Sequence, residues 1–129
     1  MAAAAGTTLT VGYIGLGLMG KSIARNILKA GFPLVVFNRS RAAVDELAAE
    51  GARAGANAAD VARQVDVLFT NLPDSPDVLD VLFGSGGAAD ALRPGTVFVD
   101  NSTIKPAVAK DIAERLKAKG VFSLDAPVS

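Results

Sequence analysis

Three glycines spaced as Gly-x-Gly-x-x-Gly are the residues that point most directly to chemistry. The segment Gly15-Leu16-Gly17-Leu18-Met19-Gly20 follows a short apolar run, Thr10 to Ile14, and precedes a stretch of helical periodicity. In that setting the first glycine permits a tight turn, the second leaves room for a pyrophosphate, and the third lets the helix pack closely on the strand. Backbone N–H groups and the positive end of the helix dipole would hold the phosphates. The motif predicts a dinucleotide site that uses all six residues.

The residues after the second apolar run, Leu34 to Phe37, decide which dinucleotide is favoured. Domains that bind NAD usually carry an acidic residue about 20 positions after the glycine turn, where it binds the ribose 2′-hydroxyl. This chain has Asn38-Arg39-Ser40-Arg41 there instead. Asn38 adds no negative charge, the guanidinium of Arg39 can face a 2′-phosphate, and Ser40 can donate a hydrogen bond, with Arg41 the weaker candidate. The sequence favours NADP(H), with NAD(H) as the alternative.

Short apolar runs alternate with helical stretches along the chain, which is typical of βα units around a parallel sheet. The sequence predicts strands at 10–14, 34–37, 53–54, 67–70, 96–99 and 121–124. It predicts helices from Met19 to a stop at Gly31, over 42–50, from a cap at Asn57 to 64, from a cap at Ser75 to Gly84, and around 108–116. We expect an α/β fold, a Rossmann-type doubly wound and mainly parallel sheet, as a single domain over 9–129 after a loose tail at 1–8.

Composition narrows the classes of function. The 13 basic and 13 acidic residues balance, so no net field favours nucleic acid or an anionic membrane. The sequence has no Cys and no His, which removes disulfides, thiolate nucleophiles, imidazole bases and the usual zinc site. No apolar run reaches the ~20 residues that span a bilayer, and the Ala-rich start lacks the basic residues of a signal peptide. We expect a cytoplasmic protein without metal, nucleic-acid or membrane partners, whose chemistry depends on a bound cofactor.

Five motifs together resemble the β-hydroxyacid dehydrogenase family, which includes 3-hydroxyisobutyrate dehydrogenase, tartronate semialdehyde reductase and glyoxylate/succinic semialdehyde reductase. They are the glycine turn, Asn38-Arg39-Ser40, Leu72-Pro73-Asp74-Ser75, Asp100-Asn101-Ser102-Thr103-Ile104 and Asp125-Ala126-Pro127-Val128-Ser129.

The resemblance implies roles for four more residues. Leu72 and Pro73 would line the cofactor site, Thr103 would contact the nicotinamide end, and Ser129 would belong to a substrate-binding signature. Local alternatives stay open: Pro73 could simply end a strand, Ser102 or Thr103 could cap the helix that starts near Pro106, and Ser129 could be a flexible terminal residue.

The resemblance also implies a reaction, the reversible transfer of hydride between a nicotinamide and a short β-hydroxyacid or its semialdehyde. Family members place their general-acid lysine in a second, helical domain, which we expect to be missing here. We therefore expect no catalytic residue in this chain, and interpret Lys105, Lys110, Lys117 and Lys119 as a solvated face. The isolated chain is expected to bind cofactor and to turn over little substrate.

Two alternatives remain at this stage. The chain could be a non-catalytic nucleotide-binding module that self-associates through the surface where a second domain would pack. It could also be the cofactor half of an imine reductase or of a 6-phosphogluconate dehydrogenase-like enzyme, which share the glycine turn and the Asn-Arg pair.

Overall fold

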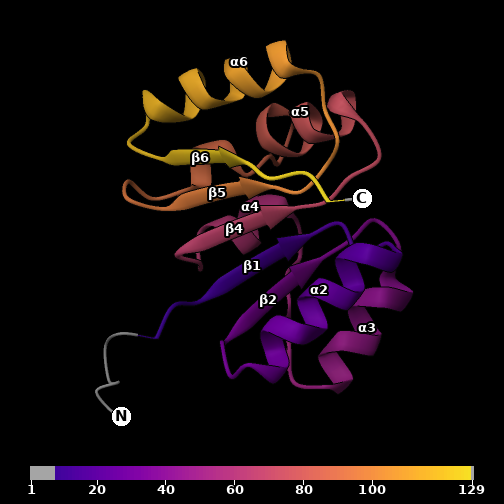
Figure 1. Ribbon diagram of the computed structural model, residues 1–129. Coiled ribbons are helices and arrows are strands. Elements are labelled where there is room, and N and C mark those ends of the chain that lie inside the picture. The colour runs from indigo at the N-terminus through magenta and orange to yellow at the C-terminus, as the bar shows by residue number, and fades with distance from the viewer. Residues whose placement is uncertain (1–7, 129) are drawn as a thin grey trace.

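A six-stranded parallel sheet forms the centre of the structure (Figure 1). The computed structural model describes residues 8–128. The strands are β1 (Val11–Ile14), β2 (Leu34–Phe37), β3 (Arg53–Ala54), β4 (Val67–Thr70), β5 (Val97–Asp100) and β6 (Phe122–Asp125), in the spatial order β3-β2-β1-β4-β5-β6. Each neighbouring pair is parallel. The predicted doubly wound sheet is confirmed, and its order reverses between β1 and β4.

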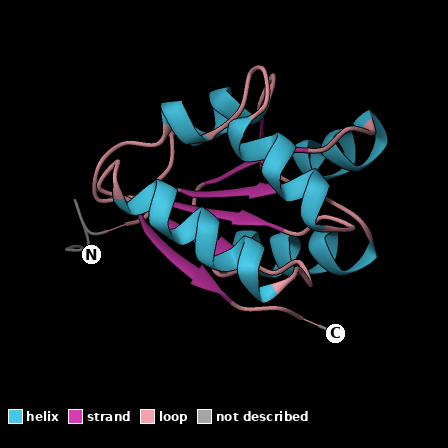
Figure 2. Cartoon of the chain, turned by 90° about the horizontal axis from the view of Figure 1, so that it is seen from above, coloured by secondary structure: helices cyan, strands magenta, loops and turns pink. Residues whose placement is uncertain are grey.

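Helices cover both faces of the sheet, as Figure 2 shows. On one face lie α2 (Leu18–Lys29) and α3 (Arg41–Ala49); on the other lie α4 (Ala58–Ala62), α5 (Ser75–Phe83), α6 (Pro106–Lys117) and the short 3₁₀ helix η1 (Ala89–Ala91). Right-handed crossovers cause this division, because the chain winds outward from β1 in one direction and from β4 in the other. None of the helices in the described part of the chain is both long and apolar enough to cross a bilayer.

Alternate residues of the strands divide the core into two apolar layers. Tyr13 and Val36 pack with Val44 and other residues of α2 and α3. Leu68 and Phe98 belong to the opposite layer, beneath α4, α5 and α6. Strands that are buried on both faces need apolar side chains at nearly every position, which explains the continuous Val, Leu and Ile runs in the sequence.

The predicted elements are present, but several strands and helices begin or end one or two positions away from their predicted bounds. β5 and β6 end at Asp100 and Asp125, one position later than predicted. The cap at Asn57 is confirmed, since its side chain accepts the N–H of Asp60 at 2.8 Å. The cap at Ser75 is wrong: Asp74 is the N-cap of α5 and accepts the Ser75 N–H at 2.7 Å.

Ser75 has a different role, which explains why it does not cap its own helix. Its side chain is buried between α5 and the start of α6, where the hydroxyl accepts the N–H of Lys105 at 3.2 Å. The exposed Asp74 is free to satisfy the end of α5. A tertiary hydrogen bond thus replaces the local one that the sequence suggested.

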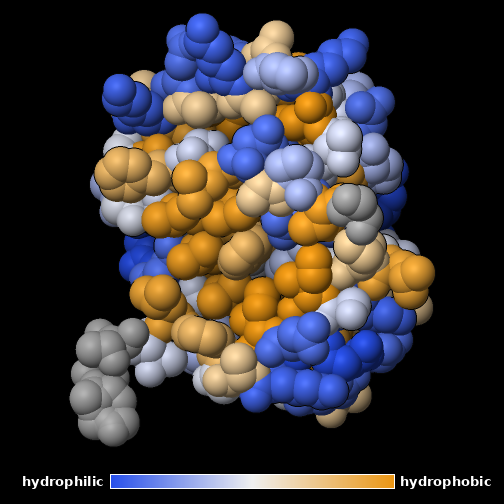
Figure 3. All heavy atoms as spheres, viewed as in Figure 1, coloured by the Kyte–Doolittle hydropathy of each residue, from blue (hydrophilic) through white to orange (hydrophobic). Residues whose placement is uncertain are grey.

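Half of the sheet keeps an apolar face without a covering helix among the described residues. α2 packs on β1 and β2, and α3 on β2 and β3. On the same side of β4, β5 and β6 lie the partly or largely exposed side chains Val67, Phe69, Val97, Val99, Phe122 and Leu124. Figure 3 shows apolar side chains gathered on this face. Self-association through it stays a prediction.

Candidate cofactor-binding site

The carboxyl ends of β1, β2 and β4 meet at the glycine turn. The Gly15 N–H donates to the carbonyl of Phe37 at 3.1 Å, and the Asn71 N–H donates to the carbonyl of Ile14 at 2.9 Å. Gly15 has φ +100°, and a Cβ there would lie 2.1 Å from the Asn71 carbonyl oxygen. Only glycine combines this left-handed backbone with such a close approach. The turn therefore lies at the switch point of the sheet, where open α/β sheets bind ligands.

The other two glycines of the turn meet different surroundings. A Cβ on Gly20 would lie 2.1 Å from the carbonyl oxygen of Gly15, so glycine is needed for α2 to pack this closely on the turn. Gly17 is exposed, and a Cβ there would meet no protein atom within 4 Å. Its φ of −67° suits any residue. Since the protein does not require glycine at 17, the space in front of it is open to a ligand that approaches the backbone closely.

The amino end of α2 opens into this space. Gly17 is the N-cap, no side chain caps the helix, and its first turn contains no acidic residue. The first helical hydrogen bond runs from the Lys21 N–H to the Gly17 carbonyl at 2.8 Å. The N–H groups of Leu18, Met19 and Gly20 therefore have no acceptor within the helix. Together with the helix dipole they can hold the negative charge of a pyrophosphate.

Two hollows follow the strand ends from this turn. The first is a groove along the turn and the start of α2, lined by Gly15, Gly17, Leu18, Met19, Gly20, Asn38, Asn71, Leu72 and Pro73. The second, of about 310 Å³, extends between β2 and α5 and is lined by Ile14, Gly15, Phe37, Asn38, Arg39, Leu72, Pro73, Asp77, Asp80 and Val81. Their shared residues make them one continuous site. A mostly apolar slot with a few polar groups suits a base and its ribose.

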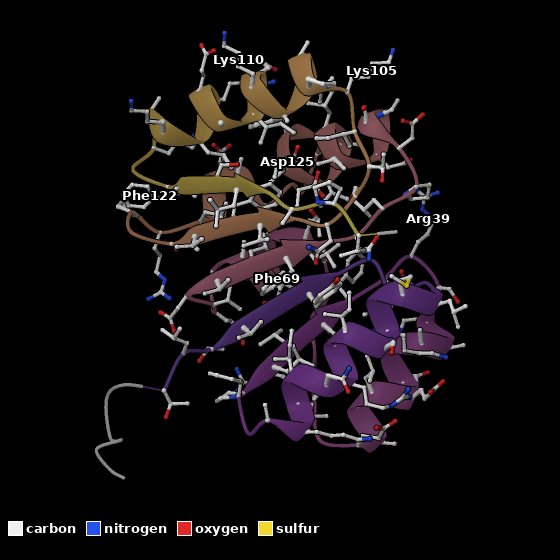
Figure 4. All side chains as sticks on the ribbon, in the orientation of Figure 1. Arg39, Phe69, Lys105, Lys110, Phe122 and Asp125 are labelled. Atoms are coloured by element: carbon white, nitrogen blue, oxygen red, sulfur yellow. The ribbon has the colours of Figure 1, made fainter. Side chains whose placement is uncertain are left out.

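Asn38 and Arg39 lie at the end of β2 but have different roles. The Asn38 side chain accepts the Leu16 N–H at 2.9 Å and donates to the Ser40 carbonyl at 3.1 Å, so it joins the two loops. Arg39 is exposed and forms no ion pair within residues 8–128, whereas Arg41 pairs with Asp45 at 3.3 Å. Figure 4 shows Arg39 at the same edge of the sheet as the glycine turn. Of the two arginines in this loop, Arg39 is therefore the one without an ion pair among the described residues.

Buried hydrogen bonds hold the Leu72-Pro73 loop against the end of β5. The Leu72 N–H donates to Ser102 Oγ at 2.7 Å. The Ser102 N–H and the Thr70 hydroxyl both donate to Asp100 Oδ1, at 3.0 and 2.8 Å. Asp100 and Ser102 are only 2% and 1% exposed. The loop that lines both hollows is thus fixed by a neighbouring strand.

This arrangement corrects the capping alternative for Ser102 and Thr103. α6 begins at Pro106 with Lys105 as its N-cap, and no side chain caps it. The Ser102 hydroxyl accepts from the Leu72 loop instead. Thr103 is exposed at the carboxyl edge of the sheet and lines neither hollow, and no hydrogen bond to α6 is seen for it among the described residues.

A second buried link supports the same edge of the sheet. The Tyr13 hydroxyl donates to Asn101 Oδ1 at 2.9 Å, and Asn101 Nδ2 donates to the carbonyl of Ala126 at 2.8 Å. The Tyr13 ring stacks on Phe69 with centroids 5.5 Å apart. Burial raises the pKa of Tyr13 above its ordinary value. The neutral phenol therefore holds the ends of β1 and β5, and the segment after β6, in fixed positions.

The structure brings most of the predicted cofactor residues together. Leu16, Ser40 and Thr103 are near the site in the chain but line neither hollow, and Ser129 lies outside the described residues. Sequence reasoning missed six lining residues, namely Ile14, Phe37, Asn71, Asp77, Asp80 and Val81. Asp77 and Val81 lie four positions apart on one side of α5, but Pro73 precedes this helix, so no local motif links them to the predicted site.

The fold and this edge define a dinucleotide-binding Rossmann domain, since a Gly-x-Gly-x-x-Gly turn joins the first strand to an uncapped helix at the switch point of a doubly wound sheet. Residues 10–129 match the family model described as the NAD binding domain of 6-phosphogluconate dehydrogenase. The chain belongs to this family.

Individual relatives agree with this assignment. Human mitochondrial 3-hydroxyisobutyrate dehydrogenase is 37% identical over 119 residues, which cover 92% of this chain and 35% of the human protein. The structure of 3-hydroxyisobutyrate dehydrogenase from Mycobacterium tuberculosis with L-serine matches with a TM-score of 0.87 at 31% identity, over 95% of this chain and 41% of that one. Psf3 in complex with NADP+ and 2-OPP matches with a TM-score of 0.87 at 35% identity, over 93% and 43%.

The resemblance to β-hydroxyacid dehydrogenases is therefore confirmed for the part of those proteins that this chain matches. The chain spans about two fifths of the length of these relatives. It is an NAD-binding domain that is similar to the matching part of 3-hydroxyisobutyrate dehydrogenases.

The glycine geometry predicts opposite outcomes for two alanine substitutions. Gly17→Ala meets no protein atom, so we expect it to fold with a loss of unfolding free energy of no more than about 1 kcal/mol. Its methyl group would occupy the open space in front of residue 17, where we expect the pyrophosphate to bind. Nucleotide affinity should therefore fall about tenfold or more. Gly20→Ala must displace the Gly15 carbonyl and should lose roughly 1–3 kcal/mol of stability. Urea unfolding measures the stability of each variant, and calorimetric titration measures its affinity for the nucleotide. A Gly17→Ala variant that binds the nucleotide as tightly as the parent would contradict the site.

Asp100 makes stability depend on pH. Burial raises the pKa of Asp100, the charge of Asp125 raises it further, and hydrogen bonds from Ser102 and Thr70 lower it without cancelling the rise. The folded state therefore holds the Asp100 proton more tightly than the unfolded chain does. The contribution of this group to the unfolding free energy is complete below the ordinary pKa and is lost as pH rises through the raised pKa.

The substitution Asp100→Asn tests whether the ionisation of Asp100 lowers the unfolding free energy as pH rises. The amide oxygen can still accept from Ser102 and Thr70, and the side chain cannot ionise. We expect the variant to be at least as stable as the parent at about pH 7 and the difference to shrink toward about pH 4, in urea unfolding at both values. The exposed Asp45→Asn serves as control. A variant that is less stable than the parent at pH 7 and not at pH 4 would show that the charge of Asp100 stabilises the fold.

Proposed function

We propose that this chain binds NADP(H) as the cofactor half of an oxidoreductase that transfers hydride between the nicotinamide and a short β-hydroxyacid or its semialdehyde. The observation that carries the cofactor choice is Arg39, an exposed guanidinium without an ion pair among the described residues, at the end of β2 beside the hollow between β2 and α5. The substrate class is supported by the relatives, whose names include 3-hydroxyisobutyrate dehydrogenases.

The charges at the end of β2 favour a 2′-phosphate. The position where NAD-binding domains usually carry a carboxylate is taken by Asn38, whose side chain is committed to Leu16 and Ser40. Arg39 follows it and can form a charge-assisted hydrogen bond with a phosphate. Such a bond contributes roughly 1.5–3 kcal/mol, which is on the order of a tenfold to a hundredfold preference for the phosphorylated cofactor. Psf3, a structural neighbour, was solved with NADP+.

The residues of this chain would hold and orient the cofactor. The amino end of α2 would bind the pyrophosphate, and Leu72 and Pro73 would line the path between the two halves of the dinucleotide. Thr103, at the carboxyl edge after β5, would lie toward the nicotinamide end. The hydride chemistry is supplied by the nicotinamide when it is bound.

Parallel calorimetric titrations with NADPH and NADH test the proposal. We expect NADPH to bind about tenfold or more tightly than NADH. Arg39→Ala should remove that margin by weakening NADPH alone. The matched control is Arg41→Ala, which also removes one arginine from the loop but takes it from an ion pair with Asp45, and it should keep most of the margin. Equal binding of the two nucleotides by the parent chain would refute NADP(H) selectivity, and binding of neither would refute the cofactor role.

A further inference from the structure

The hollow between β2 and α5 has an acidic wall that phosphate binding does not explain. α5 carries Asp77, Asp80 and Val81 along the side of the hollow that lies opposite the Phe37-Asn38-Arg39 segment. These positions are three and four residues apart and so share one side of the helix. Negative charge close to a phosphorylated ligand opposes its binding unless the carboxylate gains a contact of its own. A hydrogen-bond donor on the ligand would provide that contact.

The two aspartates are not equivalent. The Asp80 carboxylate turns toward the end of α5, where its Oδ1 lies 2.5 Å from the place that a Cβ on Gly84 would take. Asp77 is half-buried, and within residues 8–128 its carboxylate makes no hydrogen bond or ion pair. Asp77 lies in the first turn of α5, where a negative charge also favours the helix dipole. The effect on the helix dipole requires no ligand. A role of Asp77 in helix stability and a role in ligand binding therefore predict different measurements.

The shape and chemistry of the hollow suit a flat ring with a donor on its edge. Phe37, Leu72, Pro73 and Val81 provide apolar walls. An ionised carboxylate only accepts hydrogen bonds, so the group that faces Asp77 must carry an N–H or O–H. The 6-amino group of an adenine ring is such a donor. A 6-oxo purine places an acceptor at the same position, and its lone pairs would face those of the carboxylate.

We propose that Asp77 selects the base of the dinucleotide by accepting a hydrogen bond from the 6-amino group of a purine. This rests on the proposed function, because it requires a dinucleotide whose base occupies the hollow beside α5. The acidic side chain on α5 and the arginine after β2 then recognise different parts of the ligand. Arg39 faces the 2′-phosphate and Asp77 faces the exocyclic amine, so one end of the site discriminates by phosphate and the other by base.

The test compares NADPH with its analogue in which hypoxanthine replaces adenine, by calorimetry on the intact chain. The parent should bind the adenine form about tenfold more tightly, because the oxo form loses a charge-assisted hydrogen bond. Asp77→Asn can accept from an amine or donate to an oxo group, so the ratio should fall to within about twofold. Asp80→Asn is the matched control, since it removes the same charge from the same wall, and it should keep the ratio. A purely helix-stabilising Asp77 would change the melting temperature without changing the ratio.

The outcomes separate this inference from the proposed function. If the parent binds both nucleotides equally, the cofactor site stands and base selection by Asp77 is wrong. If Asp80→Asn lowers the ratio as much as Asp77→Asn does, the preference comes from charge in general, and the assignment to Asp77 fails. If the parent binds neither nucleotide, the proposed function fails together with the inference. Only a ratio that depends on Asp77 and not on Asp80 supports the proposal.

Discussion

The close approach of backbone to backbone at Gly15 is the constraint on which the site depends. The turn has φ +100°, and there is no room for a Cβ between Gly15 and the carbonyl of Asn71. Because the carbonyl of Gly15 in turn lies where a Cβ of Gly20 would be, α2 can begin directly against the turn. The amino end of α2 and the ends of three strands are thereby brought to one place. Any side chain at Gly15 would separate β1 from β4 and displace the helix end that faces the phosphates.

Hydrogen bonds between loops give this edge its rigidity. Asn38 joins the glycine turn to the loop after β2, and Ser102 joins the Leu72 loop to the end of β5. Both side chains are polar residues that sequence motifs associate with ligand binding, yet in the structure they bind protein backbone. The ligand is left with backbone N–H groups, apolar walls and a few charged side chains. Such a site is formed before the ligand arrives, which limits the entropy that binding must overcome.

The sequence predicted what depends on local pattern and failed where distant contacts decide. The glycine turn, the apolar strands and the cap at Asn57 are determined by neighbours in the chain, and each was found. Ser75 was predicted as a helix cap, and capping was an open alternative for Ser102, because their types favour that role, but each hydroxyl accepts from a residue 30 positions away. Asp77 escaped notice because its place in the hollow depends on how α5 packs across β4, which no motif encodes. Tertiary contacts therefore override local preference at the positions that shape the site.

Amide chemical shifts of the isotope-labelled chain during titration with NADPH would show which backbone N–H groups the nucleotide contacts. We expect the largest shifts at Gly17, Leu18, Met19 and Gly20, whose N–H groups have no acceptor within α2. Arg39 should shift with them, while the apolar face around Leu124 stays unchanged. Saturable binding that leaves Gly17 to Gly20 unperturbed, or that shifts residues of α6 and β6 instead, would contradict the claim that the glycine turn is the nucleotide site.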